Sequence, residues 1–193
     1  MLADILITIL LIASSFYLTI VLLRFLLQLA KADFYNPITQ FAVKATNPLL
    51  RPLRRIIPGW GAIDGASLVL AVIIQAITFF LILIALNGGI PSFNPLSLLT
   101  WSVLNVLDLI VTIYFWSVIA VVVVSWIAPG SNHPAIQLVA QVTEPVMRPV
   151  RNLMPSMGGL DLSPIIVFLI LNVLQVVIDN LQRSAGMGAL AGM

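Results

Sequence analysis

The sequence of 193 residues lacks cysteine, contains a single histidine and is only 8% charged. Without cysteine there are no disulfide bonds, no thiolate metal ligands and no cysteine nucleophile. One histidine leaves little for zinc binding or for proton transfer by imidazole. We therefore expect no catalytic residue, no metal site and no cofactor, and we expect that the protein is not an enzyme.

The shortage of charge is matched by an excess of apolar residues. Hydrophobic residues make up 61% of the chain, and the mean hydropathy is +1.12. This composition supplies too little polar surface to cover a water-soluble globule. Nine Lys and Arg stand against seven Asp and Glu, which is too few to favour direct binding of nucleic acid. The composition indicates a protein that lies in a lipid bilayer.

Four long apolar runs fit the length of a membrane span. They cover residues 5–29, 66–86, 102–127 and 162–181. About 20 residues of α-helix cross the roughly 30 Å hydrocarbon layer. Each run is continuously apolar, and lipid requires that backbone hydrogen bonds be satisfied within the segment, so helices are favoured over a β-barrel. The expected fold is all-α, with four transmembrane helices.

The connections between these runs differ in charge. The first, at 31–64, holds Lys31, Lys44, Arg51, Arg54 and Arg55, and the last, at 128–161, holds Arg148 and Arg151. The short middle connection has no Lys or Arg. Because such residues accumulate in cytoplasmic loops, both long loops are expected in the cytoplasm. Both termini are then expected on the other side of the membrane; in an organelle the same rule would place the loops in the stroma or matrix.

A displacement of 97 residues aligns the first long loop with the second without a gap. Ten of the 28 positions from 37 to 64 recur identically. They are Pro37, Gln40, Thr46, Pro48, Arg51, Pro52, Arg54, Pro58, Gly61 and Asp64, matched by Pro134, Gln137, Thr143, Pro145, Arg148, Pro149, Arg151, Pro155, Gly158 and Asp161. Shared hydrophobicity does not explain matches at such residues. The chain is predicted to be a duplicated hairpin, with repeats at 1–97 and 98–193.

Each repeat crosses the membrane twice, so both copies enter the bilayer from the same side. Such repeats are related by an axis along the membrane normal, unlike the inverted repeats of many transporters. We therefore expect two parallel repeats whose loops lie side by side on one face.

Each loop should contain a short interfacial helix, at 38–45 in the first copy. Thr46 stands two residues before Pro48, where its hydroxyl can cap a new helix whose first turn tolerates proline. Pro52 comes too late for that and should kink or end the segment. The matching elements of the second copy are 135–142, Thr143, Pro145 and Pro149. Two stiff, broken loops are expected.

A turn should follow each loop helix. Pro58 and Gly61 precede Asp64, a pattern typical of a tight turn before the second span. Asp64 can alternatively cap that span, because the helix dipole favours a negative group there. The second copy repeats the pattern with Pro155, Gly158, Gly159 and Asp161.

Each copy also carries two arginines three residues apart. They are Arg51 and Arg54 in the first loop and Arg148 and Arg151 in the second. One interpretation is structural: the arginines extend to lipid headgroups, or pair with Asp64 and Asp161 to fix how the loop folds back. The other is functional: they bind anionic lipid or a partner protein, because an acidic leaflet attracts such residues.

Three polar residues within the spans are candidate functional groups, because buried ionisable side chains are costly in a membrane. Arg24 lies close to a span end, from which it can reach the interface. Asn105 and Asp108 form a polar stripe at helical spacing. Together with Gln75, Asn172 and Gln175 the stripe is interpreted as hydrogen bonding between helices, with a conduction path as the alternative.

The second copy contains the string Thr143, Glu144, Pro145, Arg148, Pro149, Arg151, Pro155, Gly158, Gly159, Asp161, Ser163 and Pro164. This string resembles the signature of the YggT family of bacterial inner-membrane proteins, whose plastid relatives are called YlmG. The resemblance covers nearly the whole chain. The first copy departs from it, with Asn47 in place of the Glu and Ala62 in place of the second Gly.

The resemblance implies tolerance of osmotic or envelope stress, and by analogy with plastid relatives a part in arranging nucleoids and assembling an electron-transfer complex. Our first hypothesis is a non-enzymatic docking or organising factor for membrane complexes. Its expected partners are anionic membrane lipids and a membrane or cytoplasmic protein, with a homo-oligomer as a further possibility. The alternative hypothesis is an ion channel or transporter that contributes to osmotic balance.

Overall fold

The computed structural model describes residues 2–59, 61–90, 92–154 and 161–187, and within them the regular structure is helical. The six helices are α1 (Leu2–Leu29), α2 (Pro37–Ile56), α3 (Gly65–Asn87), α4 (Pro95–Ile127), α5 (Pro134–Leu153) and α6 (Ser163–Ser184). Long, short and long helices therefore follow one another twice. This order confirms the all-α fold with helical loops.

The four long helices, α1, α3, α4 and α6, are long and apolar enough to cross a membrane. They coincide with the predicted runs, except that α4 begins seven residues before the expected start at 102. Asn94 explains the difference, because its side chain accepts a hydrogen bond from the Leu96 amide at 2.9 Å and so caps the helix. Pro95 then occupies the first helical position, where proline is well tolerated.

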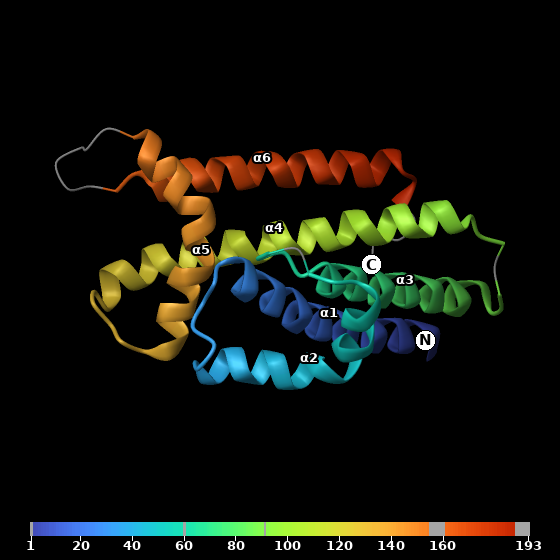
Figure 1. The fold of residues 1–193 in the computed structure, drawn as a ribbon. Coiled ribbons are helices and arrows are strands. Elements are labelled where there is room, and N and C mark those ends of the chain that lie inside the picture. The colour runs from blue at the N-terminus through green and yellow to red at the C-terminus, as the bar shows by residue number, and fades with distance from the viewer. Residues whose placement is uncertain (1, 60, 91, 155–160, 188–193) are drawn as a thin grey trace.

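The helices of the two copies pack into one molecule (Figure 1). Within the copies α1 packs against α3 and α4 against α6, and contacts between α3 and α4 join the two pairs. The short helices α2 and α5 also touch each other. The four long helices run roughly along one direction, and α5 crosses them steeply.

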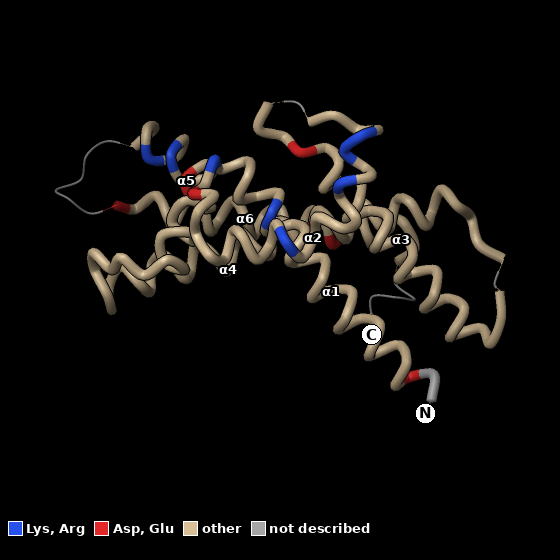
Figure 2. The backbone as a smooth tube through the Cα atoms, turned by 60° about the horizontal axis from the view of Figure 1, so that its bottom comes forward, with Lys and Arg blue, Asp and Glu red and all other residues tan. Residues whose placement is uncertain are grey.

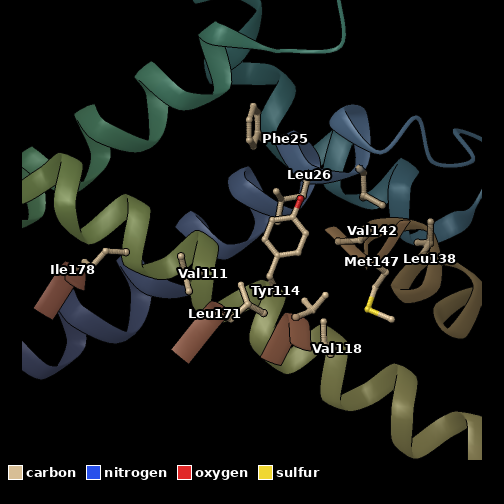
Figure 3. Close-up of a cluster of buried hydrophobic side chains, with 12 residues drawn as sticks. Phe25, Leu26, Val111, Tyr114, Val118, Leu138, Val142, Met147, Leu171 and Ile178 are labelled. Atoms are coloured by element: carbon tan, nitrogen blue, oxygen red, sulfur yellow. The ribbon is translucent and has the colours of Figure 1, made fainter. Parts of the chain in front are cut away.

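A shared core ties the repeats together. Phe25 and Leu26 of α1 meet Tyr114 and Val118 of α4, and the cluster continues onto α5 with Val142. Figure 3 shows the Tyr114 ring among these side chains. Because the cluster draws on both copies, neither hairpin completes its core alone.

The predicted breaks in the loops are wrong. α2 runs without interruption through Pro48 and Pro52, and α5 does so through its own two prolines, Pro145 and Pro149. Prolines four residues apart remove backbone bonds from a single face of the helix. Pro48 leaves the Lys44 carbonyl without its helical partner, and Pro52 does the same to the Pro48 carbonyl. All three residues are exposed, so water can solvate the freed carbonyl groups.

Thr46 and Thr143 consequently lie inside helices, and the predicted capping role is wrong. The Thr46 hydroxyl donates to the Ala42 carbonyl at 2.7 Å. The Thr143 hydroxyl lies 3.0 Å from the carbonyl groups of both Val139 and Ala140. Both threonines are buried. The helices begin instead at Pro37 and Pro134, where the side chains of Asn36 and His133 act as caps.

Candidate functional site: the paired loops

The two long loops are in direct contact. The side-chain amide of Asn36, just before α2, donates to the Pro134 carbonyl of α5 at 2.9 Å. The backbone amide of Asp33 donates to Gln141 Oε1 of α5 at 3.0 Å. These bonds confirm that the loops lie side by side. Figure 2 shows most of the Lys and Arg positions on the same side of the molecule, over α2 and α5.

Arg24 joins α1 to α2. Its Nη1 donates to the Val43 carbonyl at 3.2 Å, to Thr46 Oγ1 at 2.6 Å and to Asn47 Oδ1 at 2.9 Å. The residue is only 6% exposed, because its guanidinium group is covered by the loop helix that it binds. A guanidinium group buried in this way needs acceptors, and α2 supplies three. Arg24 therefore fastens the first loop helix to the first span.

Asp64 closes the first loop onto α2. Its Oδ2 accepts hydrogen bonds at 2.5 Å from Arg54 Nη2 and from the Ser67 hydroxyl. Asp64 is 2% exposed, whereas Arg54 is 38% exposed and also reaches Gln28 of α1. Burial opposes ionisation of Asp64, but the hydrogen bonds from Arg54 and Ser67 and the charge of Arg54 outweigh it and hold the pKa of Asp64 below its ordinary value.

The second copy pairs the same positions at the surface. Arg151 Nε lies 3.2 Å from Asp161 Oδ2, and both side chains are 45% exposed. Arg151 Nη1 also lies 3.4 Å from Glu144. The pKa of Asp161 is lowered, chiefly by its hydrogen bond with Ser163; burial opposes this effect, and Arg151 adds to it. The structural interpretation of the arginines thus holds for Arg54 and Arg151.

The two aspartates differ in whether they cap the helix that follows them. Asp161 Oδ1 accepts from the backbone amide of Ser163 at 2.9 Å, so this side chain does cap the start of α6. Asp64 makes no such side-chain cap to α3 and is committed to Arg54 and Ser67 instead. Gly61 adopts a left-handed conformation with φ of 61°, as the predicted turn requires. Pro155, Gly158 and Gly159 lie outside the described residues.

The copies differ at two positions that act together. In the first copy Arg24 contacts Asn47, but the aligned residues of the second copy are Val121 and Glu144. Glu144 meets Arg151 of its own helix. A bond between helices in the first copy is therefore replaced by an ion pair within one helix in the second. Asn47, which stands where the family string has Glu, therefore occurs in the copy that contains Arg24.

Arg51 and Arg148 occupy matching positions and are exposed on α2 and α5. Among the described residues neither takes part in an ion pair. They are therefore available to a ligand or partner outside the chain. Arg54 and Arg151, by contrast, are already engaged with carboxylates.

The interpretation of the intramembrane polar residues as a hydrogen-bonded stripe is wrong for the described residues. Asn172 donates to the Phe168 carbonyl of its own helix, and no bond between helices involves Asn105 or Asp108. Gln75, Asn105 and Asp179 instead line a cavity of about 360 Å³. The same cavity is lined by Ser14 and Ser15 of α1.

Four apolar helices, arranged as two hairpins whose loops touch, define a multi-pass membrane protein with an internal repeat. The family model described as CCB3/YggT matches residues 3–85 and 100–182, two segments offset by 97 residues at both ends. The chain belongs to the CCB3/YggT family.

Its similarity to individual relatives extends over most of each chain. An uncharacterized protein of Pseudomonas aeruginosa is 53% identical over 175 residues, covering 90% of this chain and 88% of the relative. The uncharacterized protein YggT of Escherichia coli K12 is 37% identical over 180 residues, covering 92% and 90%. An uncharacterized protein of Vibrio alginolyticus is 42% identical over 154 residues, covering 79% and 82%. No solved structure matches the chain.

Proposed function

We propose that the chain is a non-enzymatic organising factor of the bacterial inner membrane, whose paired loops form a cytoplasmic docking face. The face binds anionic lipid and a membrane or cytoplasmic protein during assembly or maintenance of membrane complexes. Through that role it contributes to tolerance of osmotic or envelope stress.

The observation that carries the proposal is the direct contact between α2 and α5, with Arg51 and Arg148 exposed on the two helices. Cations beside an acidic leaflet gain about 1 kcal/mol each from its surface potential. The positive charge is concentrated in the first loop, which has five cations and two carboxylates, whereas the second has two of each. The first loop therefore supplies most of the attraction, and the second contributes a matching surface.

Single cysteines introduced into this cysteine-free chain test the orientation. We expect Tyr35→Cys and Asn132→Cys, one in each long loop, to be protected from a membrane-impermeant maleimide applied from the periplasm. Asn87→Cys, at the opposite end of α3, should react under the same conditions. All three residues are exposed, so protection reports the membrane rather than the fold. Labelling of either loop position in intact inner membrane would contradict the proposed orientation.

Neutralising the two unpaired arginines tests docking. We expect Arg51→Gln combined with Arg148→Gln to fold and insert normally, because neither residue makes an ion pair among the described residues. A strain lacking the native protein should then grow under osmotic upshift with the wild type but not with the double variant. A photo-crosslinker at position 51 or 148 should capture one and the same partner.

The matched control is Arg183→Gln, which removes a positive charge at the far end of α6. This variant should complement fully, and a crosslinker at position 90 should not capture the partner. If the double variant supports growth as well as the wild type does, the docking role is refuted.

The alternative function is an ion channel or transporter, favoured by the polar cavity that Asn105 and Asp179 line. The cavity lies away from the loops, and toward them the interior is filled by Val111, Tyr114 and Val118. Ion flux through purified protein in liposomes, compared between the wild type and Asp108→Asn, discriminates this function from docking.

A further inference from the structure

A second feature of the first loop is a cavity of about 600 Å³ between the end of α1 and the inner side of α2. Its polar lining consists of Arg24, Gln28, Lys31, Thr39, Asn47 and Arg54. Three of these side chains are cations, and no carboxylate lines the cavity. The charge of one of these cations, Arg54, is balanced by its ion pair with Asp64. The cavity thus retains an excess of positive charge.

Two of its polar groups have hydrogen-bonding capacity that the protein does not use. Thr39 is 6% exposed, and its hydroxyl is the one buried side-chain group among the described residues that lacks a hydrogen-bond partner. A buried hydroxyl without a partner is costly, and a group bound in the cavity would supply one. All three hydrogen bonds of Arg24 use Nη1. Its other guanidinium nitrogens remain for a group inside the cavity.

Lys31 is held at the cavity by an unusual backbone conformation. The Ala32 amide bonds to the Leu27 carbonyl at 2.9 Å and the Lys31 amide to the Gln28 carbonyl at 3.1 Å, closing α1 with a Schellman motif. Lys31 occupies the left-handed position of this motif, with φ of 52°. Glycine is the usual residue there because it adopts this conformation without strain. The two hydrogen bonds of the motif hold the Lys31 backbone beside the cavity.

The second copy provides an internal comparison. A cavity of about 290 Å³ lies at the equivalent place between α4 and α5. There Arg24, Gln28, Lys31 and Thr39 are replaced by Val121, Ser125, Ala128 and Ile136, all of which line the second cavity. The fold therefore forms this cavity without the polar side chains. Arg24 and Gln28 also hold α2 and Arg54 in place, but the presence of Lys31 and Thr39 in the first copy points to a ligand rather than to a requirement of folding.

We propose that the cavity of the first copy binds a phosphate group, carried by the headgroup of an anionic phospholipid. Guanidinium, ammonium and hydroxyl donors that converge without a competing carboxylate suit phosphate oxygens. The start of α2, where Thr39 lies, adds the positive end of a helix dipole. The lipid source rests on the proposed function, which places this end of α1 at the surface of the cytoplasmic leaflet.

Native mass spectrometry of the purified, delipidated protein in neutral detergent tests this site. Phosphatidylglycerol should bind saturably and more tightly than zwitterionic phosphatidylcholine. Thr39→Val and Lys31→Gln should each weaken that binding by more than about tenfold, the effect of losing one hydrogen bond to a charged group. Thr39→Val is especially informative, because it keeps the shape and charge of the cavity and removes only an unpartnered hydroxyl.

Two controls separate the site from general surface charge. Lys44→Gln removes a cation from α2 outside the cavity, and Ile136→Val changes the aligned position of the second cavity. Both should alter binding less than about twofold. An equal loss in Lys44→Gln, or unchanged binding in Thr39→Val, overturns the site.

Soluble glycerol phosphate distinguishes the two sources of phosphate. We expect it to compete with the lipid only weakly. Should it bind as tightly as phosphatidylglycerol, the phosphate chemistry stands and the lipid source is refuted. Failure of this site is separable from failure of docking, because neither Arg51 nor Arg148 lines the cavity.

Discussion

Asp64→Asn is expected to destabilise the folded protein by about 2 kcal/mol. The substitution keeps the size of the side chain but removes the charge that Arg54 and Ser67 bind at 2.5 Å. Breaking a fully buried ion pair costs about 3–5 kcal/mol because an unpaired charge is left behind. The expected loss is smaller because Arg54 is 38% exposed and can regain water. Denaturant titration in detergent micelles, followed by circular dichroism, measures it.

The second copy supplies the matched control. Asp161→Asn removes the aligned charge from a pair in which both partners are 45% exposed. Such a surface pair contributes between zero and about 1 kcal/mol. The expectation is therefore a clear difference between the two substitutions. Equal losses would mean that burial of Asp64 does not set the strength of its pair.

The same pair predicts a response to acid. The pKa of Asp64 is lower in the folded state than its ordinary value. Its stabilising contribution is therefore complete above the ordinary pKa and is lost as the pH falls through the lowered one. As the pH falls below the ordinary pKa of 3.8, the wild type should lose more stability than Asp64→Asn does, so the two stability curves should converge.

The spans and the repeat could be read from the sequence because each has a strong and local physical cause. Lipid leaves few solutions for a long apolar run other than a helix. A pattern of Pro, Arg, Gly and Asp that recurs at fixed spacing indicates duplication. The early start of α4 was missed because residues 95–101 were assigned to the middle connection, whereas the cap at Asn94 decides the boundary.

The interior of the first loop could not be predicted from local rules. Proline opposes a helix interior, yet α2 continues through Pro48 and Pro52 because the freed carbonyl groups face water and the opposite face of the helix is anchored. The anchor, Arg24, lies 22 residues before its partner Thr46. The sequence does contain one indication of this anchor. Arg24 and Asn47 of the first copy are both replaced in the second copy, by Val121 and Glu144.

Arg24→Met is expected to release α2 from α1 and to destabilise the protein by about 2–3 kcal/mol. Methionine preserves much of the apolar volume of the arginine side chain but donates no hydrogen bond. Three acceptors of α2 lose their donor, among them the buried Thr46 hydroxyl. Hydrogen bonds from a charged group contribute about 1.5–3 kcal/mol. The adjoining cavity of about 600 Å³ admits water and limits the loss.

The release should be local, and single cysteines can detect it. Ala42→Cys reports on α2 and Val142→Cys on α5, and both native side chains are buried. In the Arg24→Met background the thiol at 42 should react with maleimide much faster, while the thiol at 142 stays protected. Val121→Met, at the aligned position of the second copy, should change neither rate. If both thiols became reactive together, α2 and α5 would unfold as one unit and Arg24 would not be a specific fastening of the first loop.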